Sequence, residues 1–183
     1  MGEAVRIIKY TGFLLILLVM QNAIGSTEIS YVDGSKSFIS IKDVNRQAEA
    51  WGICSVTYGL MAMLFDESNP AQAKQYNNFS NGASMAVVMS HVADGLRKSE
   101  DMNPNQFNSL WTYSQTLADS IPETMKTMIL ADAETLGGSG TEEFVTKIAA
   151  TATVCAANLK GQQFYIDLWR DLAKSGVLAF PNK

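Results

Sequence analysis

The chain has 183 residues, of which 47% are apolar and 17% are charged, and its formal net charge is −4. This length suits one domain, and the composition is that of a globular protein. The acidic balance argues against binding to nucleic acid or to an anionic membrane surface, because both need basic patches. We therefore expect a globular domain with no nucleic-acid partner.

The first 25 residues are typical of a secretory signal. Arg6 and Lys9 precede an unbroken apolar run at 13–20, and the small residues Ala23 and Gly25 follow it. The run is shorter than the roughly 20 residues of a membrane-spanning helix. The sequence predicts export to the periplasm or the medium, and no membrane span once the signal is removed. An uncleaved N-terminal anchor is the alternative.

A polar lead-in at 26–40 precedes the first predicted helix, and "DGS" at 33–35 indicates a turn within it. Helical periodicity then covers 41–65, because buried-type side chains recur every three or four residues. The stripe consists of Gln47, Trp51, Cys54, Tyr58, Met61 and Phe65. We place a single helical domain at 41–183.

The second and third predicted helices begin with the same signal. Asn69 and Asn103 are each followed by proline at the first helical position and glutamine at the third, a pattern that favours an N-cap. These helices are expected to end near residues 98 and 135. Pro122 lies in "SIPE", a further capping signal, so the sequence predicts a kink or break in the third helix near this proline.

The last predicted helix follows "LGGSG" at 136–140 and runs from about Thr141 to Lys174. Glu142 and Glu143 suit its first turn, where the helix dipole favours negative charge. Four long amphipathic helices with short connections favour an all-α fold, and specifically a four-helix up-down-up-down bundle.

Cys54 and Cys155 are the only cysteines, and each falls on the apolar stripe of its helix. In such a bundle the first and last helices are antiparallel neighbours, and an exported chain meets an oxidising compartment. The sequence therefore predicts a disulfide between the first and last helices. Two buried free thiols that pack as small apolar groups are the alternative.

His91 is the only histidine, and the sequence surrounds it with no catalytic or metal-binding set. Zinc and di-iron sites need more ligands of this kind, and covalent haem needs C-x-x-C-H, so we expect no cofactor. A Cys54–His91 dyad and a haem held by His91 and a methionine are weaker alternatives. Asp94 lies one turn after His91, which predicts a polar pair on one helix face.

Phe164, Tyr165 and Trp169 gather near the C-terminus and form a candidate interaction patch. The sequence favours a non-enzymatic exported helical protein that binds a protein partner, as an inhibitor, immunity protein or assembly adaptor would. The alternative is a bundle that binds a small molecule or cofactor among methionine and aromatic side chains. An enzyme is the third class, because no catalytic set is evident.

Export can be tested by the mass of the intact protein recovered from the cell envelope. Cleavage after the small residues should give a chain that begins at Ser26 or within a few residues of it. A full-length chain recovered from the cytoplasm would contradict this prediction.

Overall fold

The computed structural model describes residues 29–99 and 101–178, so the predicted signal segment lies outside the described residues. Across the described ranges the chain is all-helical and contains no strand. The elements are a 3-10 helix and five α-helices: η1 (Phe38–Ser40), α2 (Val44–Phe65), α3 (Pro70–Lys98), α4 (Pro104–Thr135), α5 (Glu142–Ala157) and α6 (Leu159–Lys174).

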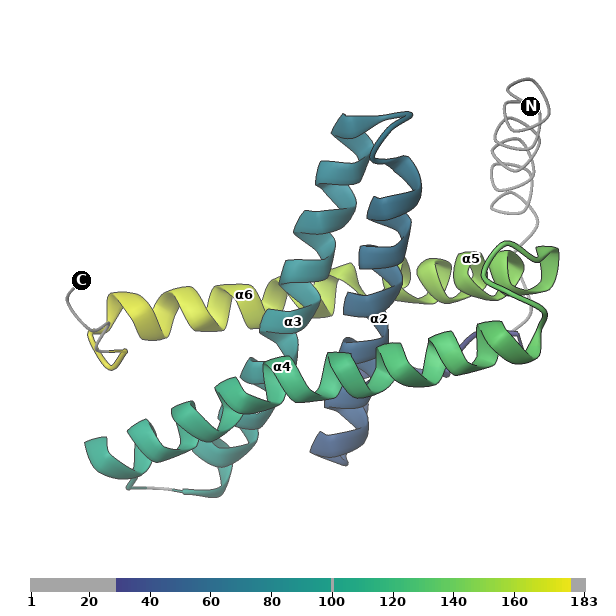
Figure 1. The fold of residues 1–183 in the computed structure, drawn as a ribbon. Helices are drawn as coiled ribbons and strands as arrows, with labels where there is room; N and C mark the ends of the chain where they lie inside the picture. Colours follow the sequence, from purple (N-terminus) through teal and green to yellow (C-terminus); the bar gives the residue numbers. More distant parts are fainter. Residues whose placement is uncertain (1–28, 100, 179–183) are drawn as a thin grey trace.

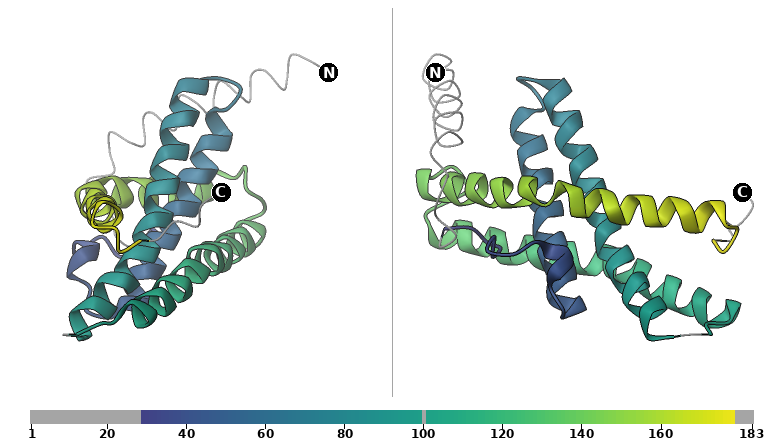
Figure 2. Two further views of the ribbon diagram at one scale, coloured as in Figure 1. Left: turned by 90° about the vertical axis from the view of Figure 1, so that its left-hand side faces the viewer. Right: turned by 180° about the vertical axis from the view of Figure 1, so that it is seen from behind.

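The helices lie in three layers (Figure 1). α2 and α3 form an antiparallel hairpin at the centre, α4 crosses one face of this hairpin, and α5 and α6 run end to end across the other. Figure 2 shows the tip of the hairpin projecting beyond the helices that cross it. The four-helix up-down-up-down bundle is therefore not confirmed.

The reason for the crossing arrangement lies in α2. Every residue from 50 to 58 is buried, so this helix is covered on all sides rather than along one stripe. Glycines allow close approach where helices cross: a Cβ on Gly52 would meet Ile121 of α4, and one on Gly82 would meet Gln162 of α6. A helix with apolar residues all round is best covered by neighbours on several sides.

α2 is also, among the described helices, the one long and apolar enough to cross a membrane by length and composition. About two thirds of its most apolar window, 67%, is buried inside the protein. Its six-residue stripe from Gln47 to Phe65 is wholly buried, as the periodicity predicts. Trp51, near the N-terminal end of this stripe, makes edge-on contacts with Phe38 and Tyr165.

Capping chemistry sets the helix starts largely where the sequence predicts them. The side chains of Asn69 and Asn103 each accept a hydrogen bond from the backbone N–H three residues later, and Thr141 does the same at the start of α5. Asp43 caps α2, which therefore begins at Val44 rather than at residue 41.

The predicted break near Pro122 is not confirmed, since α4 stays a single helix through this proline. The interruption falls instead at Asn158 and divides the last predicted helix into α5 and α6, which gives five α-helices rather than four. The side chain of Asn158 accepts the backbone N–H of Phe38 and donates to the carbonyl of Val154. The lead-in thus docks at the residue where the last predicted helix is interrupted.

The predicted disulfide is present. Cys54 of α2 and Cys155 of α5 are bonded, their Cα atoms lie 5.6 Å apart, and both residues are buried. The bond joins the central hairpin to the α5–α6 layer across a sequence separation of 101 residues. The Cys54–His91 dyad is ruled out while this bond is intact, because it leaves no free thiol.

Replacing Cys54 or Cys155 by serine should lower the free energy of unfolding by roughly 2–5 kcal/mol, the usual loss for a native disulfide in a small domain. The double variant should be no less stable than either single variant, because each change removes the same bond. Denaturant unfolding, with the reduced wild type as control, measures this. Two free thiols in denatured, unreduced protein would contradict the prediction.

Candidate functional site

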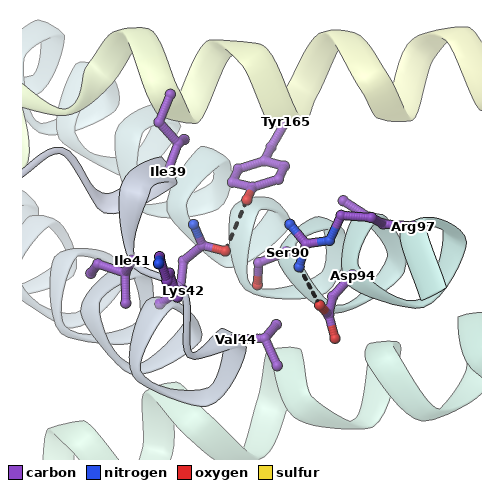
Figure 3. A pocket seen from close by; sticks show the side chains of 10 residues that line it. Ile39, Ile41, Lys42, Val44, Ser90, Asp94, Arg97 and Tyr165 are labelled. Atoms are coloured by element: carbon purple, nitrogen blue, oxygen red, sulfur yellow. Dashed lines mark hydrogen bonds and ion pairs between the residues drawn. The ribbon is translucent and has the colours of Figure 1, made fainter.

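A small polar pocket lies between the lead-in, α2, α3 and α6 (Figure 3). Its volume is about 60 Å³, which at roughly 30 Å³ per molecule suits two waters. The Tyr165 hydroxyl donates to Gln47 Oε1 at 3.0 Å, and Gln47 Nε2 donates to the carbonyl of Phe38 at 2.6 Å. These contacts tie α6 and the lead-in to α2, which is a structural role.

The predicted His91–Asp94 pair does not form a hydrogen bond in the described structure. Asp94 instead accepts from Arg97 at 2.5 Å and from Lys98 at 2.6 Å. Burial opposes ionisation of Asp94, but these two cations outweigh it and hold the pKa of the carboxyl below its usual value. Asp94, Arg97 and Lys98 of α3 thus form a local ion cluster that leaves the histidine out.

His91 is buried, and its ring meets the ring of Tyr113 from α4 edge-on at 6.2 Å between centroids. Its Nε2 atom has no hydrogen-bond partner in the described structure. Burial lowers the pKa of the imidazole, Asp94 opposes this shift and Lys98 adds to it. His91 is therefore a neutral core residue between α3 and α4.

The three aromatic residues of the predicted C-terminal patch do not share one exposed face. Tyr165 points into the core, Trp169 is half-buried, and Phe164 is 55% exposed. Of the three, only Phe164 is exposed to solvent in the described structure. The helical period of α6 places residues 165 and 169 toward the protein and residue 164 toward solvent.

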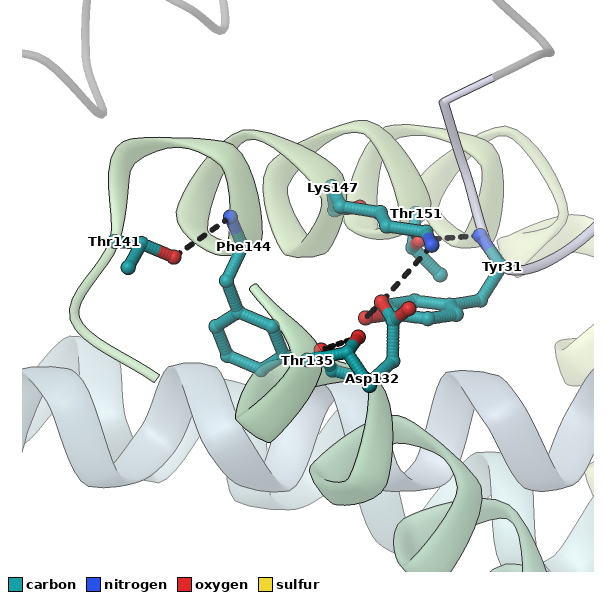
Figure 4. Close-up of polar contacts among 7 residues, drawn as sticks. All are labelled: Tyr31, Asp132, Thr135, Thr141, Phe144, Lys147 and Thr151. Carbon is teal, nitrogen blue, oxygen red and sulfur yellow. Dashed lines mark hydrogen bonds and ion pairs between the residues drawn. The ribbon is translucent and has the colours of Figure 1, made fainter. Parts of the chain in front are cut away.

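A polar cluster joins the lead-in to the α4–α5 connection (Figure 4). Asp132 accepts from the Tyr31 hydroxyl at 2.5 Å and from Lys147 Nζ at 2.9 Å, and these bonds hold its pKa below the usual value. Lys147 also lies 4.4 Å from the centre of the Tyr31 ring, a cation–π contact. Sequence reasoning missed this cluster because its members are far apart in the chain.

Met63, the most exposed large apolar side chain among the described residues, borders a groove between the C-terminal half of α2 and the first half of α5, together with the exposed Leu64. The volume of this α2–α5 groove is about 200 Å³. Both helices contribute mainly apolar side chains to it, with Ser139 at the connection: Leu60, Met61, Met63, Leu64, Ser139, Phe144, Val145, Ile148 and Ala149. Met63 is 67% exposed and Leu64 is 55% exposed.

Acidic residues flank both wall segments of the α2–α5 groove in the sequence. Asp66 and Glu67 follow its α2 wall, Glu142 and Glu143 precede its α5 wall, and all four are exposed. The groove exists because α2 stays apolar past the point where α4 and α5 cover it. The sequence signal was "LMAML" at 60–64, which has more apolar residues than one helical stripe can bury.

No cluster of three or more histidine, cysteine, aspartate or glutamate residues suited to a metal ion occurs in the described parts of the chain. Comparison with protein-family models, with curated proteins and with solved structures gives no match to this chain. The α2–α5 groove is therefore assessed on its own geometry.

Acidification should destabilise the fold through His91. Because its pKa is lower in the folded chain than the ordinary value of 6.5, the unfolded state takes up the proton first as the pH falls. The free energy of unfolding should decrease from about pH 7.5 to about pH 5.5, with a slope no steeper than about 1.4 kcal/mol per pH unit.

Denaturant unfolding across this range measures the slope, with His91→Gln as the control. The pKa values of Asp94 and Asp132 are held below the ordinary range of a carboxyl by their cationic and hydroxyl partners, so these groups stay ionised there. The slope should shrink in His91→Gln. An unchanged slope would contradict the assignment to this histidine.

Proposed function

We propose that this chain is a non-enzymatic exported protein that binds a protein partner through the α2–α5 groove, in the manner of an inhibitor, immunity protein or assembly adaptor. The observation that carries the proposal is the exposure of Met63 and Leu64 beside an apolar groove. Solvent-exposed apolar side chains that adjoin one another mark interaction surfaces, whereas scattered ones need no explanation.

The size of the groove favours a protein over a small molecule. Organic ligands usually occupy sites of roughly 300–1,000 Å³ that enclose most of their surface and supply a few polar contacts. The α2–α5 groove has about 200 Å³ and mainly apolar walls. Such a site suits one or two apolar side chains presented by a folded partner, the arrangement found at interaction hot spots.

The disulfide supports the exported part of the proposal. Structural disulfides between buried cysteines form and persist in oxidising compartments and are rare in the cytosol. The Cys54–Cys155 bond is buried at both ends and joins two layers of the fold. We therefore propose a periplasmic or secreted location.

Site-specific photo-crosslinking in the producing cell tests the proposal. A photoreactive phenylalanine at Leu64 should give a discrete crosslinked protein species, because this side chain borders the groove and is 55% exposed. The same residue at Asn108, which is exposed on α4, should give none or much less.

A second substitution in the same experiment tests whether the partner contacts this surface. Met63→Ser in the crosslinking chain should reduce the yield without unfolding the protein, since this side chain is 67% exposed. Equal crosslinking from positions 64 and 108 would contradict the proposal. A bound organic molecule in the native mass spectrum, lost with Met63→Ser, would favour the small-molecule alternative.

A further inference from the structure

We infer that the occupant of the α2–α5 groove is an amphipathic helix of the partner, with an apolar face that enters the groove and basic residues beside it. This inference rests on the proposed function and names the class of partner segment. It follows from the backbone chemistry, the side chains and the charge around the groove.

The first argument is that the walls of the groove offer no backbone to an incoming strand. A peptide that binds in an extended form gains most of its affinity by hydrogen bonding to a free sheet edge. Both walls here are helices, which present no sheet edge, and the described residues include no strand. A partner segment must therefore satisfy its own backbone, and a helix does so.

The second argument is the shape and chemistry of the walls. Leu60, Met63 and Leu64 lie on α2 at spacings of three and four, and Val145 and Ala149 lie on α5 at a spacing of four. Two such helical faces bound a groove that accepts anchors repeating with the same period from a third helix. Met63 is unbranched and flexible, so it can adapt to the anchor that enters.

The third argument is charge. Asp66 lies just beyond the α2 wall, and Glu142 and Glu143 lie just before the α5 wall. Glu142 is three residues before the wall residue Val145, which places it on the same helix face. The nearby cation Lys147 is already paired with Asp132. The border of the groove is thus acidic, which favours a basic partner and disfavours an acidic one.

Two synthetic stapled helices provide the probe. Both carry the same leucines at positions i, i+3, i+4 and i+7, and the remaining positions are all lysine in one peptide and all glutamate in the other. Fluorescence anisotropy measures their binding to the purified protein at low and high salt. The lysine peptide should bind at least about tenfold more tightly at low salt, and this preference should shrink at high salt.

Variants of the protein separate the apolar from the charged contribution. Leu64→Ser should weaken binding of the lysine peptide at both salt concentrations. Neutralising the border with Glu142→Gln and Glu143→Gln should reduce the lysine preference several-fold. The matched control, Asp119→Asn with Asp171→Asn, removes two exposed carboxylates on α4 and α6 and should leave the preference unchanged. Circular dichroism confirms that each variant is folded.

Three results would overturn the inference. They are equal binding of the two peptides, a loss of preference as large in the control as in the border variant, and a homodimer that Leu64→Ser dissociates. If photo-crosslinking at position 64 captures a partner while the lysine peptide fails to bind, the proposed function stands and this inference falls. If neither occurs, both fall.

Discussion

The fold depends on one constraint: the middle of α2, residues 50–58, is mainly apolar and must be covered on every side. A single antiparallel partner can cover one face of a helix, and α3 does this along the whole length of the hairpin. The remaining faces are covered by α4 from one side and by α5 from the other, with η1 packed at the N-terminal end. The three-layer arrangement is the consequence, because helices that cross a hairpin cover both of its members.

Several polar contacts then hold the outer layers in place. Asn158, Gln47 and Asp132 each bond to the lead-in or to a neighbour of it, and the disulfide joins α2 to α5. A buried polar group that loses its partner costs about 1–3 kcal/mol, so the contacts of the buried Gln47 and Asn158 specify one arrangement more strongly than apolar packing does. The lead-in is therefore part of the folded domain, and its contacts fix the position where α5 ends and α6 begins.

The candidate site lies where α2 is still apolar but is no longer covered on every side. The hairpin tip projects beyond the helices that cross it (Figure 2). α2 is still apolar at the point where this cover ends. Burial of apolar surface is worth about 25 cal/mol per Å², and exposed Met63 and Leu64 forgo part of that stabilisation. A partner helix would recover it on binding. The Cys54–Cys155 bond joins the two helices that form the walls of the groove, which restricts their relative motion before binding and limits the entropy lost in the complex.

The sequence by itself determined the local features: the all-helical class, the starts of α3, α4 and α5, the buried stripe of α2 and the pairing of Cys54 with Cys155. These depend on capping side chains, on periodicity and on there being two cysteines, all of which can be read along the chain. Only the tertiary structure decided that α4 continues through Pro122, that the last helix breaks at Asn158 and that Tyr165 lies inside. It also decided which part of "LMAML" stays exposed, because a helix that is apolar all round gives no sign of which face its neighbours will leave uncovered.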